Sequence, residues 1–148
     1  MIESYLKHEA SRKLKGIPAL PLTPEQTTEL CALLEAQRLD VEAPPKGREE
    51  MLLHLLEERV SPGVDPSAEV KAQFLDALVR GEKSSPLITK KEALRLLGTM
   101  LGGYNVKTLI DALSMPDLAE NAADALCHLI LVYDAIDRVA ALAETNDQ

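Results

Sequence analysis

The sequence predicts an all-α protein, and three observations lead to that prediction. Leucine occurs 26 times and alanine 18 times, whereas valine, isoleucine and threonine together occur 21 times, a balance that favours helix over strand. Only three Tyr and one Phe are aromatic. Apolar residues recur every three or four positions, as on one face of a helix. The 148 residues, 46% of them hydrophobic, suffice for one domain with an ordinary core, and we expect a single domain over residues 1–148.

Residues 1–22 predict a leading helix and a stiff connector, because a polar, helix-compatible stretch ends at a glycine that two prolines follow. Residues 23–60 predict a first helix pair. Its first helix opens on a capping box, in which Thr23 is the N-cap, Pro24 takes the first helical position and Gln26 completes the box. A loop with two adjacent prolines separates this helix from the second, whose leucines recur at helical spacing.

Two further pairs follow, over residues 65–101 and 105–144. Asp65 and Thr89 are the predicted N-caps of the two helices in the second pair, which a Gly-Gly dipeptide ends. Asn105 is the predicted N-cap of the third pair.

The spacing of these helices indicates a repeat. The openings at Pro24 and Pro66 lie 42 positions apart, and so do those at Arg48 and Lys90. That is the length of a HEAT-type repeat of two helices, although the two units share almost no side-chain identity. We therefore expect a HEAT-like α-α superhelix of about seven helices, with three stacked pairs and the leading helix.

The last helix is predicted to run as one long element from residue 116 to about residue 140. Residues 125–133 are apolar almost all round, which is typical of a helix covered on both sides. Since the terminal unit of a solenoid needs a polar outer face, this pattern predicts either a docking partner or cover by the first helix or the C-terminal tail. With the Gly-Gly turn before it, this helix supplies the candidate partner-binding residues: Gly102, Gly103, Tyr104, Asn105, Leu129, Ile130, Val132 and Tyr133.

The turn from Gly102 to Asn105 has two interpretations. In the structural one, a glycine ends one helix in a left-handed conformation and Asn105 caps the next. In the functional one, residues without side chains admit the backbone of a partner, and Tyr104 anchors it. Gly-Gly turns between helices are ordinary, which favours the structural interpretation.

No catalytic or metal site is predicted. Glu50, His54 and Glu57 share one helical face, but their spacing is that of neither a zincin nor a di-iron bundle, and we interpret the face as solvated. Asp124 and His128 are four positions apart, and we expect the carboxylate to orient the imidazole as a structural pair.

The two cysteines, Cys31 and Cys127, lie outside any CxxC motif and among leucines, so we expect each to behave as a small core hydrophobe. No nucleophile motif, Walker motif or dinucleotide fingerprint occurs. We expect no bound cofactor.

The formal net charge of -8 repels phosphate backbones and makes nucleic acid an unfavourable direct partner. The sequence contains no apolar run of about 18 residues and no basic N-terminal stretch before an apolar one, which predicts neither a membrane span nor a secretory signal. We expect a soluble protein in a reducing compartment, the cytoplasm.

Several segments together resemble a known family. They are Tyr5–His8, Ser61–Pro66, Val70–Leu78, Ser85–Leu87, Leu96–Asn105 and Leu109–Leu113. The most specific of them, Leu-Gly-Thr-Met-x-Gly-Gly-Tyr-Asn, is not a general HEAT consensus. These residues resemble the N-terminal domain of the aconitase B family, although residues 39–46 form a longer loop than is usual there.

The resemblance implies a HEAT-like domain that is not an enzyme by itself, because the family holds its [4Fe-4S] cluster and its catalytic residues in later domains. It implies a helical module for association with itself or another protein, for regulation, or for substrate access in an aconitate hydratase of the tricarboxylic acid cycle. The alternative that it implies is an RNA-binding regulatory module, against which the net charge of -8 argues. A small independent enzyme has only the spacing of Glu50, His54 and Glu57 in its favour.

Overall fold

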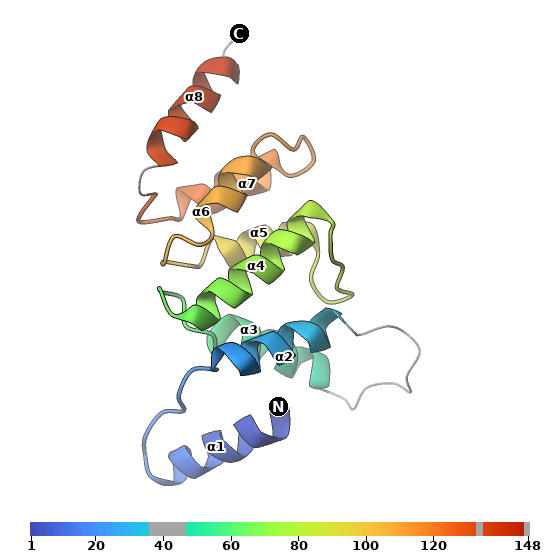
Figure 1. The fold of residues 1–148 in the computed structure, drawn as a ribbon, viewed down its shortest axis with the longest axis vertical. Helices are drawn as coiled ribbons and strands as arrows, with labels where there is room; N and C mark the ends of the chain where they lie inside the picture. Colours follow the sequence, from blue (N-terminus) through green and yellow to red (C-terminus); the bar gives the residue numbers. More distant parts are fainter. Residues whose placement is uncertain (36–46, 133–134, 147–148) are drawn as a thin grey trace.

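The computed structural model describes residues 1–35, 47–132 and 135–146, and every regular element in these ranges is a helix (Figure 1). The prediction of an all-α fold is confirmed. None of the helices in these ranges has both the length and the apolar character of a membrane span. The helices are α1 (Ile2–Leu14), α2 (Pro24–Glu35), α3 (Arg48–Glu58), α4 (Pro66–Arg80), α5 (Lys90–Leu97), α6 (Val106–Ala112), α7 (Ala119–Cys127) and α8 (Ile136–Asn146).

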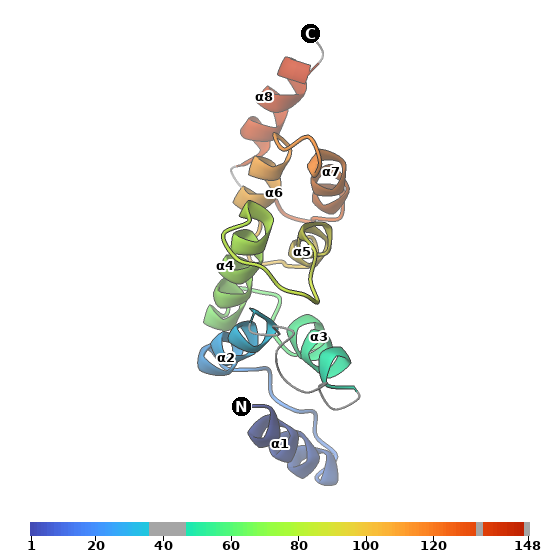
Figure 2. The ribbon, with the colours of Figure 1, turned by 90° about the vertical axis from the view of Figure 1, so that its right-hand side faces the viewer.

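The helices stack in two rows along the long axis of the molecule. Figure 2 shows α2, α4 and α6 in one row and α3, α5 and α7 in the other. Helix α4 packs against α2 in its own row and against α5 in the other, and α7 packs against α5 and α6. Helices α1 and α8 lie at opposite ends of the stack.

The predicted caps position the helix starts. Thr23 and Gln26 form the reciprocal capping box, in which each residue's backbone N–H donates to the other's side-chain oxygen. Asp65 accepts a hydrogen bond from the backbone N–H of Ser67 at the start of α4, and Thr89 accepts one from Glu92 at the start of α5.

The prediction of one long helix from residue 116 to about 140 is wrong. Helix α7 ends at Cys127, and α8 is a separate element. The backbone N–H groups of His128 and Leu129 donate three residues back, to Ala125 and Leu126, so the last turn tightens before it ends. The buried face of α7 consists of Ala122 and Ala125. Beyond it, Leu126 and Leu129 pack partly buried against the core, whereas Ile130 and Leu131 are exposed.

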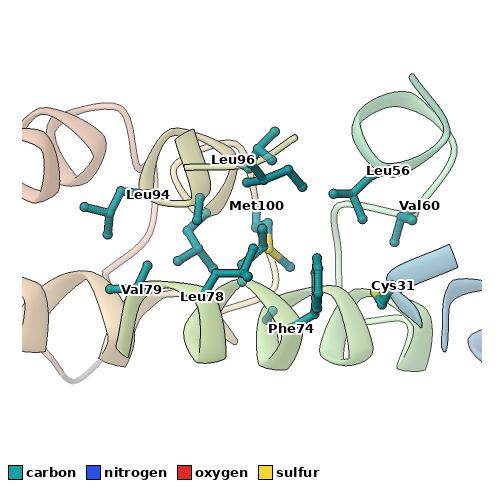
Figure 3. Close-up of a cluster of buried hydrophobic side chains, with 14 of the residues drawn as sticks. Cys31, Leu56, Val60, Phe74, Leu78, Val79, Leu94, Leu96 and Met100 are labelled. Carbon is teal, nitrogen blue, oxygen red and sulfur yellow. The ribbon is translucent and has the colours of Figure 1, made fainter. Parts of the chain in front are cut away.

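The core runs along the interior of the stack, between the two rows. Figure 3 shows Phe74 and Leu78 of α4 among side chains from neighbouring elements, and Cys31 of α2 lies in the same cluster. Burial raises the pKa of the Cys31 thiol to about 12, so it packs as a hydrophobe, as predicted. Cys127 is exposed, which contradicts its predicted place in the core: it lies on the side of α7 that faces α8.

One charged residue is also buried. Lys71 of α4 is 2% exposed, and no ion pair between described residues includes it. Burial lowers the pKa of Lys71 to about 8, and the nearby charges of Glu57 and Glu58 offset only part of this effect. The fold therefore carries a lysine whose charge destabilises it.

We predict that Lys71→Met raises the free energy of unfolding at pH 7 by about 1 to 3 kcal/mol, because an apolar side chain replaces a buried cation. The pKa of Lys71 in the folded chain lies below its ordinary value of 10.5. The cost of the buried charge is therefore full below pH 8 and disappears as the pH rises from about 8 to 10.5. Chemical denaturation across this pH range should show the gap between variant and wild type narrowing. Lys91→Met, on the exposed side of α5, is the control, and an equal gain there would contradict the assignment.

Candidate protein interface

The turn from Gly102 to Asn105 packs on the chain's own preceding inter-pair turn. Next to it, the backbone N–H of Leu101 donates to the carbonyl of Pro62 across 2.7 Å. The hydroxyl of Tyr104 donates to the carbonyl of Val64 across 3.3 Å. The turn between α5 and α6 is thereby fastened to the turn between α3 and α4.

Gly102 is required by this contact. A Cβ atom at Gly102 would lie 2.1 Å from the carbonyl oxygen of Gly63, which no side chain permits. Close approach of a backbone, the basis of the functional interpretation, is therefore real, but that backbone belongs to the same chain. Gly103 has a φ of 89°, a left-handed conformation that favours glycine.

Asn105 does not cap the helix that follows it. The residue takes the N-cap position of α6 without a side-chain cap hydrogen bond. Its buried Nδ2 instead donates to the carbonyls of Leu97 and Met100, across 2.6 and 3.1 Å. Asn105 thus donates to the carbonyl of Leu97 at the end of α5 and to that of Met100 in the turn that follows. Since α5 ends at Leu97 and not at residue 101, where the predicted second pair ends, Leu101 lies outside the helix and is exposed.

A third glycine in the same segment lets two helices approach each other. A Cβ atom at Gly98, just after α5, would lie 3.1 Å from the Cβ of Ala125 in α7. That separation is tighter than ordinary van der Waals contact. Each distinctive residue of the segment thus has a role in packing, which supports the structural interpretation of the motif.

We predict that Gly102→Ala destabilises the chain by about 2 to 4 kcal/mol, since the turn must move away from Gly63. Thermal melting measures the effect. Gly63→Ala is the matched control, because a Cβ atom there meets nothing within 4 Å, and it should change the melting temperature little. Similar melting temperatures for the two variants would show that the two turns are not in close contact.

Glu50, His54 and Glu57, which share one helical face, do not form a metal site. His54 and Glu50 are exposed, and Glu57 is paired with Arg95. In the part of the chain that the structure describes, no group of three or more His, Cys, Asp or Glu residues has the arrangement to hold a metal ion.

The pair at the end of α7 differs from the prediction. Nδ1 of His128 lies 2.7 Å from the backbone carbonyl oxygen of Asp124, so the backbone and not the predicted carboxylate holds the imidazole. Near the end of a helix such carbonyls lack helical donors, and a side chain in the last turn can reach them.

The segment after α7 exposes apolar side chains. Ile130 is 82% exposed and Leu131 is also exposed, whereas Leu129 and Val132 are half-buried. Tyr133 lies outside the described residues. Neither α1, at the other end of the stack, nor the described part of the C-terminal segment covers Ile130.

Exposed apolar residues gather on the side of the stack where the chain passes from one helix pair to the next. Figure 1 places the α3–α4 turn, the α5–α6 turn and the segment after α7 one above another on this side. Residues 60–64, 99–105 and 128–132 of these turns contain no Asp, Glu, Lys or Arg. We call their exposed large apolar side chains the apolar edge: Val64, Leu101, Tyr104, Ile130 and Leu131.

The two loops within pairs that the structure describes have the opposite character. The α4–α5 loop carries Glu82 and Lys83, the α6–α7 loop carries Asp117, and neither exposes a large apolar side chain. The apolar edge is therefore a property of one side of the stack.

A groove adjoins the apolar edge at its C-terminal end. It has a volume of about 620 Å³ between α7 and α8, and its walls include Leu126, Val132 and Val139. Arg138 at the start of α8 donates to Asp111 of α6 across 2.9 Å. Burial raises the pKa of Asp111, but the hydrogen bonds from its cationic neighbours outweigh this effect and lower the pKa to about 2. The carboxylate of Asp111 is therefore ionised at neutral pH, and its ion pair with Arg138 links α8 to α6.

Comparison with known proteins places this fold in a family. A family model described as Aconitate B N-terminal domain matches residues 4–148. Aconitate hydratase B of Synechocystis sp. is 48% identical over 148 residues, 99% of this chain. The Escherichia coli protein of that name is 47% identical over the whole chain, and the Helicobacter pylori one 42% over 98% of it. The chain spans about 16% of the length of these relatives. It belongs to the aconitate hydratase B family and corresponds to its N-terminal domain.

Proposed function

We propose that this chain is a non-catalytic protein-association module of an aconitate hydratase B and that the apolar edge is its docking surface. The observation that carries the proposal is the exposure of Ile130 and Leu131 beside an apolar groove. Large apolar side chains grouped on a surface are typical of interaction sites.

The cysteines support a non-catalytic role. The resemblance implies a [4Fe-4S] cluster on thiolate ligands, and this chain has two cysteines. Cys31 is buried in the core with its pKa raised to about 12, whereas Cys127 is exposed on α7. They come from different elements and are too few for such a cluster, so the residues present do not fit the group. The activity named for the relatives is therefore assigned to the parts of those proteins that this chain does not match.

The chemistry of the edge supports a protein partner. Residues 60–64, 99–105 and 128–132 of its turns contain no lysine or arginine, so they offer nothing to neutralise phosphates, and the edge does not favour the RNA-binding alternative. Aromatic and apolar side chains with few charges are characteristic of the centre of a protein interface. We assign the partner role to the remainder of an aconitate hydratase B polypeptide, through which the module would influence regulation or substrate access in the tricarboxylic acid cycle.

We predict that Ile130→Asp leaves the melting temperature within about 2 °C of wild type, because the exposed side chain contributes little to the fold. The same change should abolish binding to the remainder of the Escherichia coli relative, expressed as a separate polypeptide and followed by analytical ultracentrifugation. Ser84→Asp, in the exposed α4–α5 loop, introduces the same charge away from the edge and should preserve binding. A large loss of melting temperature would show that Ile130 is buried, and intact binding would remove the edge as the docking surface.

A second prediction concerns catalysis. After anaerobic incubation with iron and sulfide, the purified chain should show neither the visible absorbance of a cluster nor isomerisation of citrate, because its cysteines do not form a ligand set. The full-length Escherichia coli relative, treated in parallel, serves as the positive control. Citrate turnover by this chain would overturn the assignment of a non-catalytic module.

A further inference from the structure

Helix α1 is fastened to the stack by its inner face. Tyr5 is buried, and its hydroxyl donates to the carbonyl of Leu20 in the connector across 3.1 Å. Nε of Arg12 donates to the carbonyl of Pro18 across 2.6 Å. The connector therefore folds back along α1.

A second side of α1 carries an apolar stripe, with the exposed carboxylate of Glu3 at its N-terminal end. Leu6, Ala10 and Leu14 are spaced by four residues and lie on one side of α1. All three are exposed, and Leu14 is 90% exposed. Beside Leu6 and Ala10 runs a groove of about 660 Å³ between α1 and the connector, with Ile17 and Ala19 on its far wall. The ion pair of Glu9 and Arg59 also lines this groove. We call this surface the α1 groove.

Helical spacing places Lys7 and Lys13 on either side of the apolar stripe, whereas Lys15 is the C-cap of α1. Lys7, Lys13 and Lys15 are exposed, and Lys13 lines the groove itself. None of the three belongs to an ion pair among the described residues, whereas Arg80, Lys83, Arg95, Lys107 and Arg138 all do. In a chain with 24 acidic and 16 basic residues, Lys7 and Lys13 thus border the apolar stripe without carboxylate partners among the described residues and are available to an outside group.

We propose that the α1 groove binds an acidic protein segment that carries apolar side chains at helical spacing. The apolar side chains of the segment fill the space between α1 and the connector, and its carboxylates pair with Lys7 and Lys13. This is the helix-in-groove mode of recognition, with charges that fix the orientation of the bound segment. The surface is separate from the apolar edge, so the inference does not rest on the proposed function.

The same features favour a protein segment over a nucleic acid or a membrane. Glu3 and Glu9 lie on the same helix as the lysines, and their negative charges repel phosphates. A phosphate backbone also makes no favourable contact with an apolar stripe. An anionic bilayer is a plane that meets a large part of a molecule whose net charge is -8 and is repelled by it. A short protein segment, in contrast, contacts only the lysines beside the α1 groove and not the acidic remainder of the molecule.

The probe is a fluorescein-labelled helical peptide of about four turns, with leucine at every fourth position and glutamate beside each leucine. Fluorescence anisotropy with the full chain at about 50 mM salt should show saturable binding, weakened about tenfold by about 200 mM salt. A peptide with lysine in place of glutamate and one with serine in place of leucine should each bind at least about tenfold more weakly. Equal binding of either control peptide would overturn the proposal.

Variants of the chain locate the site. The double change Lys7→Glu and Lys13→Glu should weaken binding of the acidic peptide by about tenfold or more. The matched control changes Lys90→Glu and Lys91→Glu, which are exposed on α5 and also belong to no ion pair among the described residues, and it should bind as wild type does. Circular dichroism checks that each variant is folded.

Three outcomes would overturn the proposal: no saturable binding of the acidic peptide, equal loss in both double variants, or tighter binding of polyuridine or of anionic vesicles at the same salt. Ile130→Asp separates the two surfaces, since it should leave peptide binding unchanged. Peptide binding that fails while the apolar edge still binds its partner would remove this inference alone.

Discussion

The contact between the α3–α4 turn and the α5–α6 turn is the constraint on which the stacking of this chain depends. Each helix pair exposes an apolar face that only the next pair can cover, so a stack needs a fixed approach between consecutive pairs. Here that approach is set by backbone, since Gly102 lies against the carbonyl of Gly63 and Leu101 donates to Pro62. Leu94 and Leu97 of α5 can then pack without exposure in the core.

The contact between these two turns requires α5 to end before Leu101, and a second interaction ends the helix there. Asn105 supplies the donors for the carbonyls of Leu97 and Met100, so the helix stops four residues before Leu101. Leu101 is exposed as a consequence and becomes part of the apolar edge. The exposed surface here follows from the way the chain satisfies its backbone, which links the family's most distinctive segment to the candidate interface.

Sequence reasoning succeeds where the signal is local. Thr23, Asp65 and Thr89 act within three residues of themselves, and their caps are all present. It fails where the decisive partner is distant in sequence. The apolar pattern through residues 116–140 does not show that the helix ends at Cys127. An asparagine before a helix also looks the same in sequence whether its side chain caps that helix or, as Asn105 does, hydrogen-bonds to the end of the preceding one. The exposure of Ile130 was one of two open alternatives, because periodicity does not tell a covered apolar face from an uncovered one.

The exposed apolar residues are informative because the fold does not need them. Ile130 and Leu131 lie outside the core and follow the end of α7, and polar residues there would cost the stack nothing while lowering its tendency to aggregate. The same argument applies to Leu14 on the outer face of α1. Exposed apolar side chains that contribute little to the core are best explained by contacts with other molecules. They lie on two surfaces, the apolar edge and the α1 groove, and only the α1 groove has lysines beside it. We therefore expect the two surfaces to bind partners of different charge.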